Sequence, residues 1–359
     1  RTLENQRERK LTILMNPFMS CGARLPVYAL FAAAFFPSNG QNLVFLLYLI
    51  GILVAILTGM IMGRTLLSGS STGFIMELPP YHLPTLKGVG LRTWDRVKLF
   101  IKDAGKVIII MVFILNVLNS IGTDGSFGKH QSSDSVLGQV SQTLTPLFSP
   151  LGIEKENWPA TTGIFTGVLA KETVVGTLDT IYTQLAEEAS GSDTESVPFN
   201  LLRSLKEAVA TVPENLGGIS EFLLDPLGMN VGDLSSHDSA AATQEINAGI
   251  FGAMASRFDG QAGAFAYLLF ILLYFPCVAT IGAIVRETGG AWAGFVAAWT
   301  TGVAYTASTI FYQAATFDKH PASSSAWILG LALFIAAVVV ALRFWSRRES
   351  GLHPQRTGA

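Results

Sequence analysis

Residues 43–63 read LVFLLYLIGILVAILTGMIMG, a run of 21 positions without one charged side chain. Three further charge-free runs follow at 263–285, 291–317 and 322–342. A helix needs about 20 apolar residues to cross the core of a bilayer, so each run is long enough to span a membrane. Together they predict an all-α fold, a polytopic transmembrane helical bundle.

The composition of the whole chain supports a membrane protein. Of its 359 residues 50% are apolar and 14% are charged, and the mean hydropathy is +0.43; about 25% of the residues of an ordinary soluble domain are charged. This hydrophobicity excludes a largely disordered chain, and two cysteines are too few for a disulfide scaffold. The N-terminus RTLENQRERK lacks the apolar core of a signal peptide. Because no initiating Met is present, we expect the chain to be part of a longer protein.

Two apolar stretches are interrupted and predict broken or re-entrant helices. Residues 11–36 contain Pro17, Gly22 and Pro26, and Pro26 suits the first turn of a new helix over 25–36. Residues 146–182 are interrupted by Pro150, Pro159 and the charged pair Lys171-Glu172. This second stretch either dips into the membrane and returns or crosses it fully, in which case a further crossing is needed before 261.

The charges are distributed unevenly and predict an orientation. Residues 183–240 hold ten acidic and two basic side chains, a net charge of −8, so the rest of the chain carries +6. Basic residues cluster at 1–10, 92–106 and 343–348, with Arg64 and Arg286 between them. The positive-inside tendency places these clusters, and the C-terminus, in the cytoplasm and one soluble acidic insert outside. Residues 93–104 are amphipathic and predict an interfacial helix that runs into a span over 105–121.

Ionisable and soft side chains inside apolar segments are candidate functional groups because they are costly to bury. Four places qualify, and each has a plainer structural interpretation. Cys21, with Met19 and Ser20, lies at the first break, where a thiol, a thioether and free carbonyls suit a late transition metal; the alternative is a packed cysteine beside a kink. The candidate metal ligands at all four places are Cys21, Met19, Ser20, Cys277, Glu172 and Glu77.

The other three places leave comparable alternatives open. Cys277 directly follows Pro276 in a charge-free run and either contributes a ligand or accompanies a proline kink. Glu172 is either a hard oxygen ligand or the ion-pair partner of Lys171. Glu77 lies in a proline-rich loop that is either a transient metal contact or a rigid turn. A disulfide between the two cysteines is also compatible with the sequence.

Motifs for enzymatic chemistry are scarce, so we expect no enzyme. The string Gly69–Gly73 (GSSTG) resembles a nucleophile elbow but lacks the strand–turn–helix context. The sequence contains neither the HExxH zinc motif nor a GxxxxGK[ST] phosphate loop. An intramembrane protease would need a Ser/His, Asp/Asp or metal-hydrolase pair, and no credible pair is present.

Several segments together resemble a known family. The run LTILMNPFMSCGARLPVYALFAAAFF at 11–36, ELPPYHLP at 77–84, the TGVLAKETVVGTL part of 151–178 and FPCVATIGAIVRE at 275–287 are similar to the C-terminal membrane core of FeoB-type ferrous iron transporters. The resemblance implies membrane uptake of Fe²⁺ across the bacterial inner membrane. It also implies a GTP-binding domain, with GTP and Mg²⁺, and a first gate module elsewhere in the full-length protein. No cofactor is expected within this chain.

The resemblance also implies a segmentation and a site. The expected segments are a cytoplasmic segment 1–10, a membrane core with a cytoplasmic loop 11–92, the first part of a gate module 93–182, an acidic extracytoplasmic insert 183–244, the rest of the gate module with the last spans 245–345, and a cytoplasmic tail 346–359. Membrane cysteines proposed to line the iron path in this family map onto Cys21 and Cys277. Thr173 stands where some members carry another cysteine.

The expected partners are Fe²⁺, the lipid bilayer, the remainder of the full-length chain and small cytoplasmic Feo accessory proteins, and no nucleic acid. The oligomeric state stays open. The main alternative is a gate-module transporter of a nucleoside or another small polar solute. Such a site should contain paired Asn, Gln and carboxylate groups and would not need thiols.

Overall fold

A computed structural model describes Leu3, residues 5–68, 83–122, 135–190 and 249–352, and five residues between 206 and 213. Within this part of the chain the secondary structure is helical without strands, apart from one isolated bridge between Gly122 and Ser135. The predicted all-α class is therefore confirmed. The N-terminal half contains α1 (Gln6–Met15), η1 (Asn16–Phe18), η2 (Gly22–Arg24), α2 (Leu25–Phe35), α3 (Gly40–Arg64), α4 (Leu86–Phe100), the π-helical turn η3 (Ile101–Gly105) and α5 (Lys106–Ser120).

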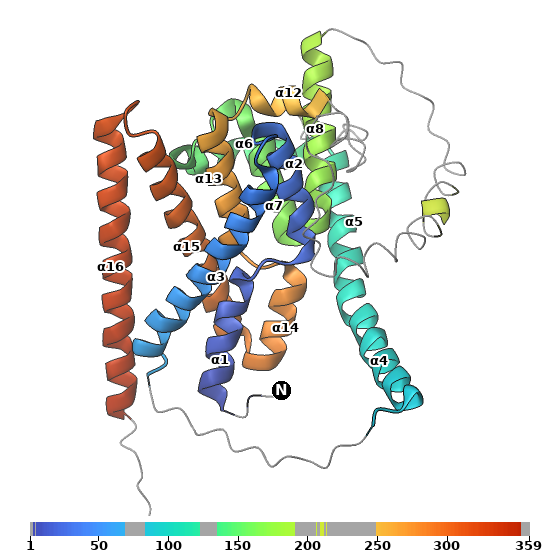
Figure 1. Ribbon diagram of the computed structural model, residues 1–359, viewed down its shortest axis with the longest axis vertical. Coiled ribbons are helices and arrows are strands. Elements are labelled where there is room, and N and C mark those ends of the chain that lie inside the picture. Colours follow the sequence, from blue (N-terminus) through green and yellow to red (C-terminus); the bar gives the residue numbers. More distant parts are fainter. Residues whose placement is uncertain are drawn as a thin grey trace, which may run out of the picture.

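The remaining elements continue the bundle. They are α6 (Val136–Leu144), η4 (Thr145–Leu151), η5 (Lys155–Asn157), α7 (Trp158–Leu169), η6 (Lys171–Thr173), α8 (Val174–Ser190), α12 (Gly249–Ala255), α13 (Gly260–Leu273), α14 (Val278–Thr288), α15 (Gly290–Ala315) and α16 (Pro321–Leu352). Figure 1 shows them as a bundle of steep helices with α13 near its centre and α16 at one edge.

Four helical segments are long and apolar enough to cross a membrane. They are Gln6–Phe35, Gly40–Arg64, Gly260–Thr288 and Pro321–Phe344. The predicted span at 291–314 forms the 26-residue helix α15, which is not among these four because many of its residues are small or hydroxylated. The predicted span at 105–121 contains a shorter apolar helix, Ile108–Ser120.

The amphipathic helix begins earlier than predicted. It starts at Leu86 because the Thr85 side chain accepts a hydrogen bond from the Gly88 amide at 3.3 Å and caps the helix. Through η3 it continues into α5, so α4 and α5 form one long arm that leaves the bundle at its lower edge in Figure 1. Trp94 and Leu99 are largely exposed on this arm.

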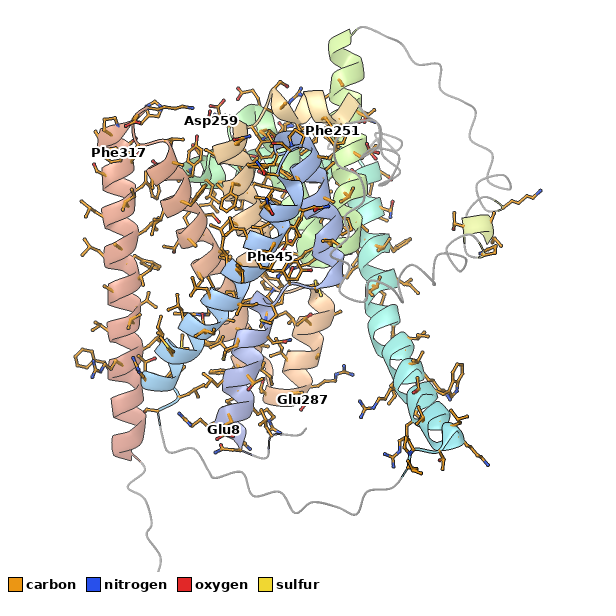
Figure 2. The ribbon with its side chains drawn as sticks, viewed as in Figure 1. Glu8, Phe45, Phe251, Asp259, Glu287 and Phe317 are labelled. Atoms are coloured by element: carbon orange, nitrogen blue, oxygen red, sulfur yellow. The ribbon has the colours of Figure 1, made fainter. Side chains whose placement is uncertain are left out.

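The basic segments gather at one end of the bundle. In Figure 1 the start of α1, the end of α3, α4, the end of α14 and the lower part of α16 all lie at the bottom. The labelled residues in Figure 2 agree, with Glu8 and Glu287 at this end and Asp259 and Phe317 at the other. The upper end carries α12 and the end of α8, which flank the acidic segment. The distribution has the form that the positive-inside tendency requires.

Helices α7 and α8 form an antiparallel hairpin. A side chain on Gly163 would meet Leu178, and one on Gly167 would meet Val174, so the two helices run in opposite directions in close contact. The hairpin has its tip at residues 170–173 inside the bundle, and α8 returns to the upper end (Figure 1). This hairpin has the shape that the re-entrant alternative predicts, since α8 returns toward the end from which α7 starts.

The core forms where α13 packs against α2, α3, α7 and α15. Between Ala264 and Tyr274 almost every α13 side chain is buried except Phe265, whose ring lies 4.6 Å from that of Phe311. The rings of Phe31 and Tyr267 stack at 4.9 Å, and Phe258 meets Phe31 edge-on at 5.3 Å. Such aromatic contacts add stabilisation beyond burial alone.

At the upper end Asp259 joins the α12–α13 turn to the α15–α16 turn. Its carboxylate accepts hydrogen bonds from Lys319 Nζ at 2.6 and 2.9 Å and from the Tyr312 hydroxyl at 3.0 Å. The hydrogen bond from Lys319 is the main reason that the pKa of Asp259 is lowered, and partial burial opposes it.

Candidate functional site

Three helix breaks meet in the interior of the bundle. The first is residues 16–24 between α1 and α2, the second is residues 274–277 between α13 and α14, and the third is the hairpin tip at 170–173. The short helix η2 of the first break contacts η6 of the third, and η1 packs against α13. Non-helical backbone at this depth is tolerated only where protein buries it or where it lines a cavity.

The first break contains Pro17, and the Arg24 side chain binds the backbone carbonyls that the break leaves free. Met19 and Cys21 are extended, with φ of −71° and −106°. The Arg24 side chain is only 2% exposed and donates to the carbonyls of Pro17 at 3.2 Å and Met19 at 3.5 Å. One guanidinium therefore satisfies carbonyls that the broken helix leaves free, while its Nε has no hydrogen-bond partner among the described residues.

The second break begins at Tyr274 and ends at Cys277. Cys277 is extended, with φ of −58° and ψ of 156°, and directly precedes α14. Its Sγ lies 3.2 Å from Thr280 Oγ1. The thiol is therefore held at the N-terminus of a half-helix, where the backbone dipole favours negative charge.

Tyr274 connects the second break with the hairpin. Its hydroxyl donates to the Ile164 carbonyl at 3.4 Å, and Lys171 Nζ lies 4.9 Å from the centre of its ring. Lys171 is 5% exposed, so this cation–π contact is largely desolvated. A Cβ on Gly167 would stand 2.3 Å from the Tyr274 hydroxyl, which makes glycine necessary there.

Each predicted cysteine lies at one of the breaks that meet in the interior. Cys21 and Cys277 are free thiols, so they do not form the disulfide that the sequence allowed. Cys21 precedes η2, which contacts η6 of the hairpin tip, and Cys277 ends the break that begins at Tyr274, whose ring contacts Lys171 of the same tip. Cys21 is exposed and Cys277 is half-buried.

The other candidate ligands are arranged less directly. The Ser20 hydroxyl lies 3.2 Å from the Tyr28 hydroxyl, and Met19 is 48% exposed. The backbone of Glu172 belongs to η6, but its side chain lies outside the described part of the structure, as does the whole of Glu77. Among the described residues, no three His, Cys, Asp or Glu side chains gather closely enough to hold a metal ion.

Sequence reasoning did not assign roles to the side chains that hold the breaks together. Tyr267 and Tyr274 are seven residues apart and lie on one face of α13, opposite Gly163 and Gly167 of α7. Tyr267 donates to the Ala160 carbonyl at 3.0 Å, in parallel with the bond from Tyr274. The sequence did contain a signal for this contact. The two tyrosines are seven residues apart and the two glycines four apart, and both spacings keep residues on one face of a helix.

The fold defines the class of polytopic helical membrane proteins in which broken helices meet inside the bundle. Residues 44–96 match the family described as "Ferrous iron transport protein B C terminus", and residues 101–291 match the family described as "Nucleoside recognition". The chain belongs to the FeoB family and corresponds to its C-terminal membrane portion. The predicted resemblance is thereby confirmed.

The similar curated proteins carry the same name. The chain is 43% identical over 345 residues to "Fe(2+) transporter FeoB" of Legionella pneumophila (strain Lens), covering 96% of this chain and 44% of that protein. It is 43% identical to "Fe(2+) transporter FeoB" of Escherichia coli (strain K12), with 96% and 43% covered. The chain thus spans less than half the length of these relatives. No solved structure matches.

Proposed function

We propose that this chain is the permease portion of a ferrous iron uptake transporter and that Fe²⁺ passes where the three helix breaks meet. The relatives are named as Fe²⁺ transporters, and they align with nearly the whole of this chain. The observation that carries the proposal is the meeting of the three breaks: η2, which Cys21 precedes, contacts η6 of the hairpin tip, and Tyr274 of the break that ends at Cys277 lies under Lys171 of that tip. Sites between discontinuous helices are a recurring solution in transporters.

The chemistry of the breaks suits a soft divalent cation. Fe²⁺ must lose water in a low-dielectric interior, and two thiolates can replace part of that water. Met19 would contribute a weaker thioether, Ser20 a hydroxyl, and Glu172 and Glu77 carboxylates. A small set of ligands also favours release, since conduction requires binding that is weak enough to reverse.

Two buried cations lie beside the path. Arg24 and Lys171 are both at least 95% buried, Arg24 against backbone carbonyls and Lys171 against the Tyr274 ring. Deprotonated Cys21 and Cys277 would supply two negative charges. Iron binding should therefore release protons and weaken as the pH falls.

The remainder of the longer protein would drive and regulate this path. We assign that role to a GTP-binding domain with GTP and Mg²⁺ and to a first gate module, with Feo accessory proteins in the cytoplasm. The basic end of the bundle would face the cytoplasm of a bacterial inner membrane. The acidic insert would then concentrate cations outside, an effect that salt should weaken.

The test is anaerobic Fe²⁺ binding to the purified chain in detergent at two ionic strengths. The variants are Cys21→Ser, Cys277→Ser and their combination, with Ser323→Ala, an exposed upper-end residue, as control. We expect saturable binding that the double variant loses and the control keeps. Unchanged affinity in the double variant would refute the ligand assignment, and binding removed by salt alone would place the cation on the acidic insert.

A nucleoside or another small polar solute is the second candidate substrate. It is favoured by the description of the family that matches residues 101–291. Uptake of labelled uridine into proteoliposomes that is unaffected by the double cysteine variant would support it. Iron uptake that uridine does not inhibit would oppose it.

A further inference from the structure

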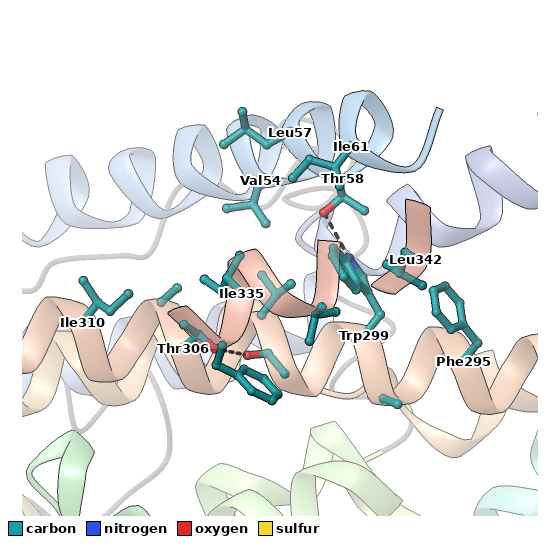
Figure 3. Close-up of a pocket in the computed structure, with 16 residues that line it drawn as sticks. Val54, Leu57, Thr58, Ile61, Phe295, Trp299, Thr306, Ile310, Ile335 and Leu342 are labelled. Atoms are coloured by element: carbon teal, nitrogen blue, oxygen red, sulfur yellow. Dashed lines mark hydrogen bonds between the residues drawn. The ribbon is translucent and has the colours of Figure 1, made fainter. Parts of the chain in front are cut away.

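An apolar cleft separates α16 from α3. It encloses about 430 Å³, and α15 forms its back wall. Figure 3 shows Val54, Leu57 and Ile61 on α3 facing Ile335 and Leu342 on α16 across Trp299 of α15. The cleft lies at the edge of the bundle, away from the helix breaks.

The polar groups of the cleft are already paired with one another. Trp299 Nε1 donates to Thr58 Oγ1 at 3.4 Å, and Thr306 Oγ1 donates to the Gly302 carbonyl at 2.7 Å (Figure 3). Thr58 and Thr306 are also buried, so the lining offers little to a polar ligand. The occupant that fits this lining is therefore a hydrocarbon.

The shape of the cleft suits an extended chain. The lining residues on α15 run from Phe295 to Ile310, about 22 Å at roughly 1.5 Å per residue. A cleft of this length with a volume of about 430 Å³ has room for one acyl chain laid along α15.

The lower end of the cleft is basic. Phe295 stacks on Trp292 with ring centres 5.0 Å apart, and Lys10 Nζ lies 5.4 Å above the Trp292 ring. Arg64 ends α3 one turn beyond Ile61 and is exposed. An anionic group at this end would be attracted by both cations, as lipid headgroups are by juxtamembrane basic residues.

We propose that the cleft between α3, α15 and α16 binds one membrane phospholipid with an anionic headgroup. An acyl chain lies along Phe295 and Trp299, and the phosphate lies near Lys10 and Arg64. The bound lipid fills the space beside α16 and fastens this peripheral helix to the bundle.

The test of the chain site is native mass spectrometry of the purified protein titrated with phosphatidylglycerol. Gly302 lines the cleft with nothing within 4 Å of an added Cβ, and Gly294 on the same helix has equal space but lies outside the lining. Gly302→Leu should lower lipid retention at least tenfold, and Gly294→Leu should leave it unchanged. Ala298→Leu, a second substitution in the lining, should act like Gly302→Leu if that variant fails to fold.

The headgroup is tested with phosphatidylcholine that carries the same acyl chains. The unaltered protein should retain phosphatidylglycerol at least fivefold better, and the pair Lys10→Gln and Arg64→Gln should remove that preference. Equal retention of the two lipids, or full retention by Gly302→Leu, would overturn the proposal. A change from dimer to monomer in Gly302→Leu without a change in lipid would instead assign the cleft to contact between copies of the chain.

Discussion

Replacing Gly167 by alanine should weaken the attachment of the α7–α8 hairpin to α13. The new methyl group would stand 2.3 Å from the Tyr274 hydroxyl and 2.9 Å from Val174 Cγ2. Contacts of this length do not occur, so Tyr274 must move and its hydrogen bond to Ile164 must lengthen or break. Because Tyr274 also lies under Lys171, the second and third helix breaks would separate.

The magnitude follows from three contributions. Overpacking of a filled core costs roughly 1–3 kcal/mol, and a lost interhelical hydrogen bond in a membrane protein adds about 0.6 kcal/mol. Alanine returns about 1 kcal/mol through its higher helix propensity. The free energy of unfolding should therefore fall by roughly 0.5–2.5 kcal/mol.

The assay is reversible unfolding in detergent mixed with sodium dodecyl sulfate, followed by tryptophan fluorescence. Gly176→Ala is the matched control, because Gly176 lies in the same hairpin with nothing within 4 Å of an added Cβ, so it should be neutral or gain up to about 1 kcal/mol. Tyr274→Phe removes the hydroxyl that the methyl group meets, so it should restore part of the stability when combined with Gly167→Ala. Equal stability of the two alanine variants, or additive losses in the double variant, would refute the reasoning.

Three further predictions concern other contacts. Gly51→Ala would place a methyl group 2.6 Å from the carbonyl of the last residue of η1. The free energy of unfolding should fall by roughly 1–3 kcal/mol in the same assay. Gly63→Ala, which has open space on the same helix, should not destabilise the protein. Arg24→Met should cost roughly 1.5–3 kcal/mol because two carbonyls lose a charged donor, and the thiols should react faster with a maleimide as the break loosens; an unchanged rate would contradict this. Since the folded pKa of Asp259 is lowered, its stabilisation is fully present above the usual carboxyl pKa near 4 and is lost as the pH falls through the lowered folded pKa. Lys319→Met should therefore remove up to about 1 kcal/mol at pH 7 and progressively less as the pH falls below 4, as melting curves across this range would show.

Local sequence features predicted the elements more completely than the site. Pro26 located a helix over 25–36, and the structure has α2 at Leu25–Phe35; the charge-free run at 43–63 became α3, Gly40–Arg64. These successes rest on proline geometry and hydropathy, which act along the chain. The early start of α4 was missed because two glycines obscured the Thr85 cap.

The arrangement of the site depended on contacts between distant segments. Both cysteines were recognised at breaks, but that these breaks meet at the tip of the α7–α8 hairpin became visible only in three dimensions. The roles of Arg24 and Lys171 were equally hidden, because a buried cation is satisfied by whichever carbonyl or ring the fold supplies. Periodicity along one segment carries no information about which other segment it meets.

The hairpin formed by α7 and α8 affects the direction in which the later helices cross the membrane. A segment that enters and leaves by the same end adds no net crossing, so its length can change without inverting any helix that follows it. The acidic segment begins where this hairpin ends, and the next membrane helix, α13, starts at that same end (Figure 1). A change in the length of that segment would therefore leave the direction of α13 to α16 unchanged.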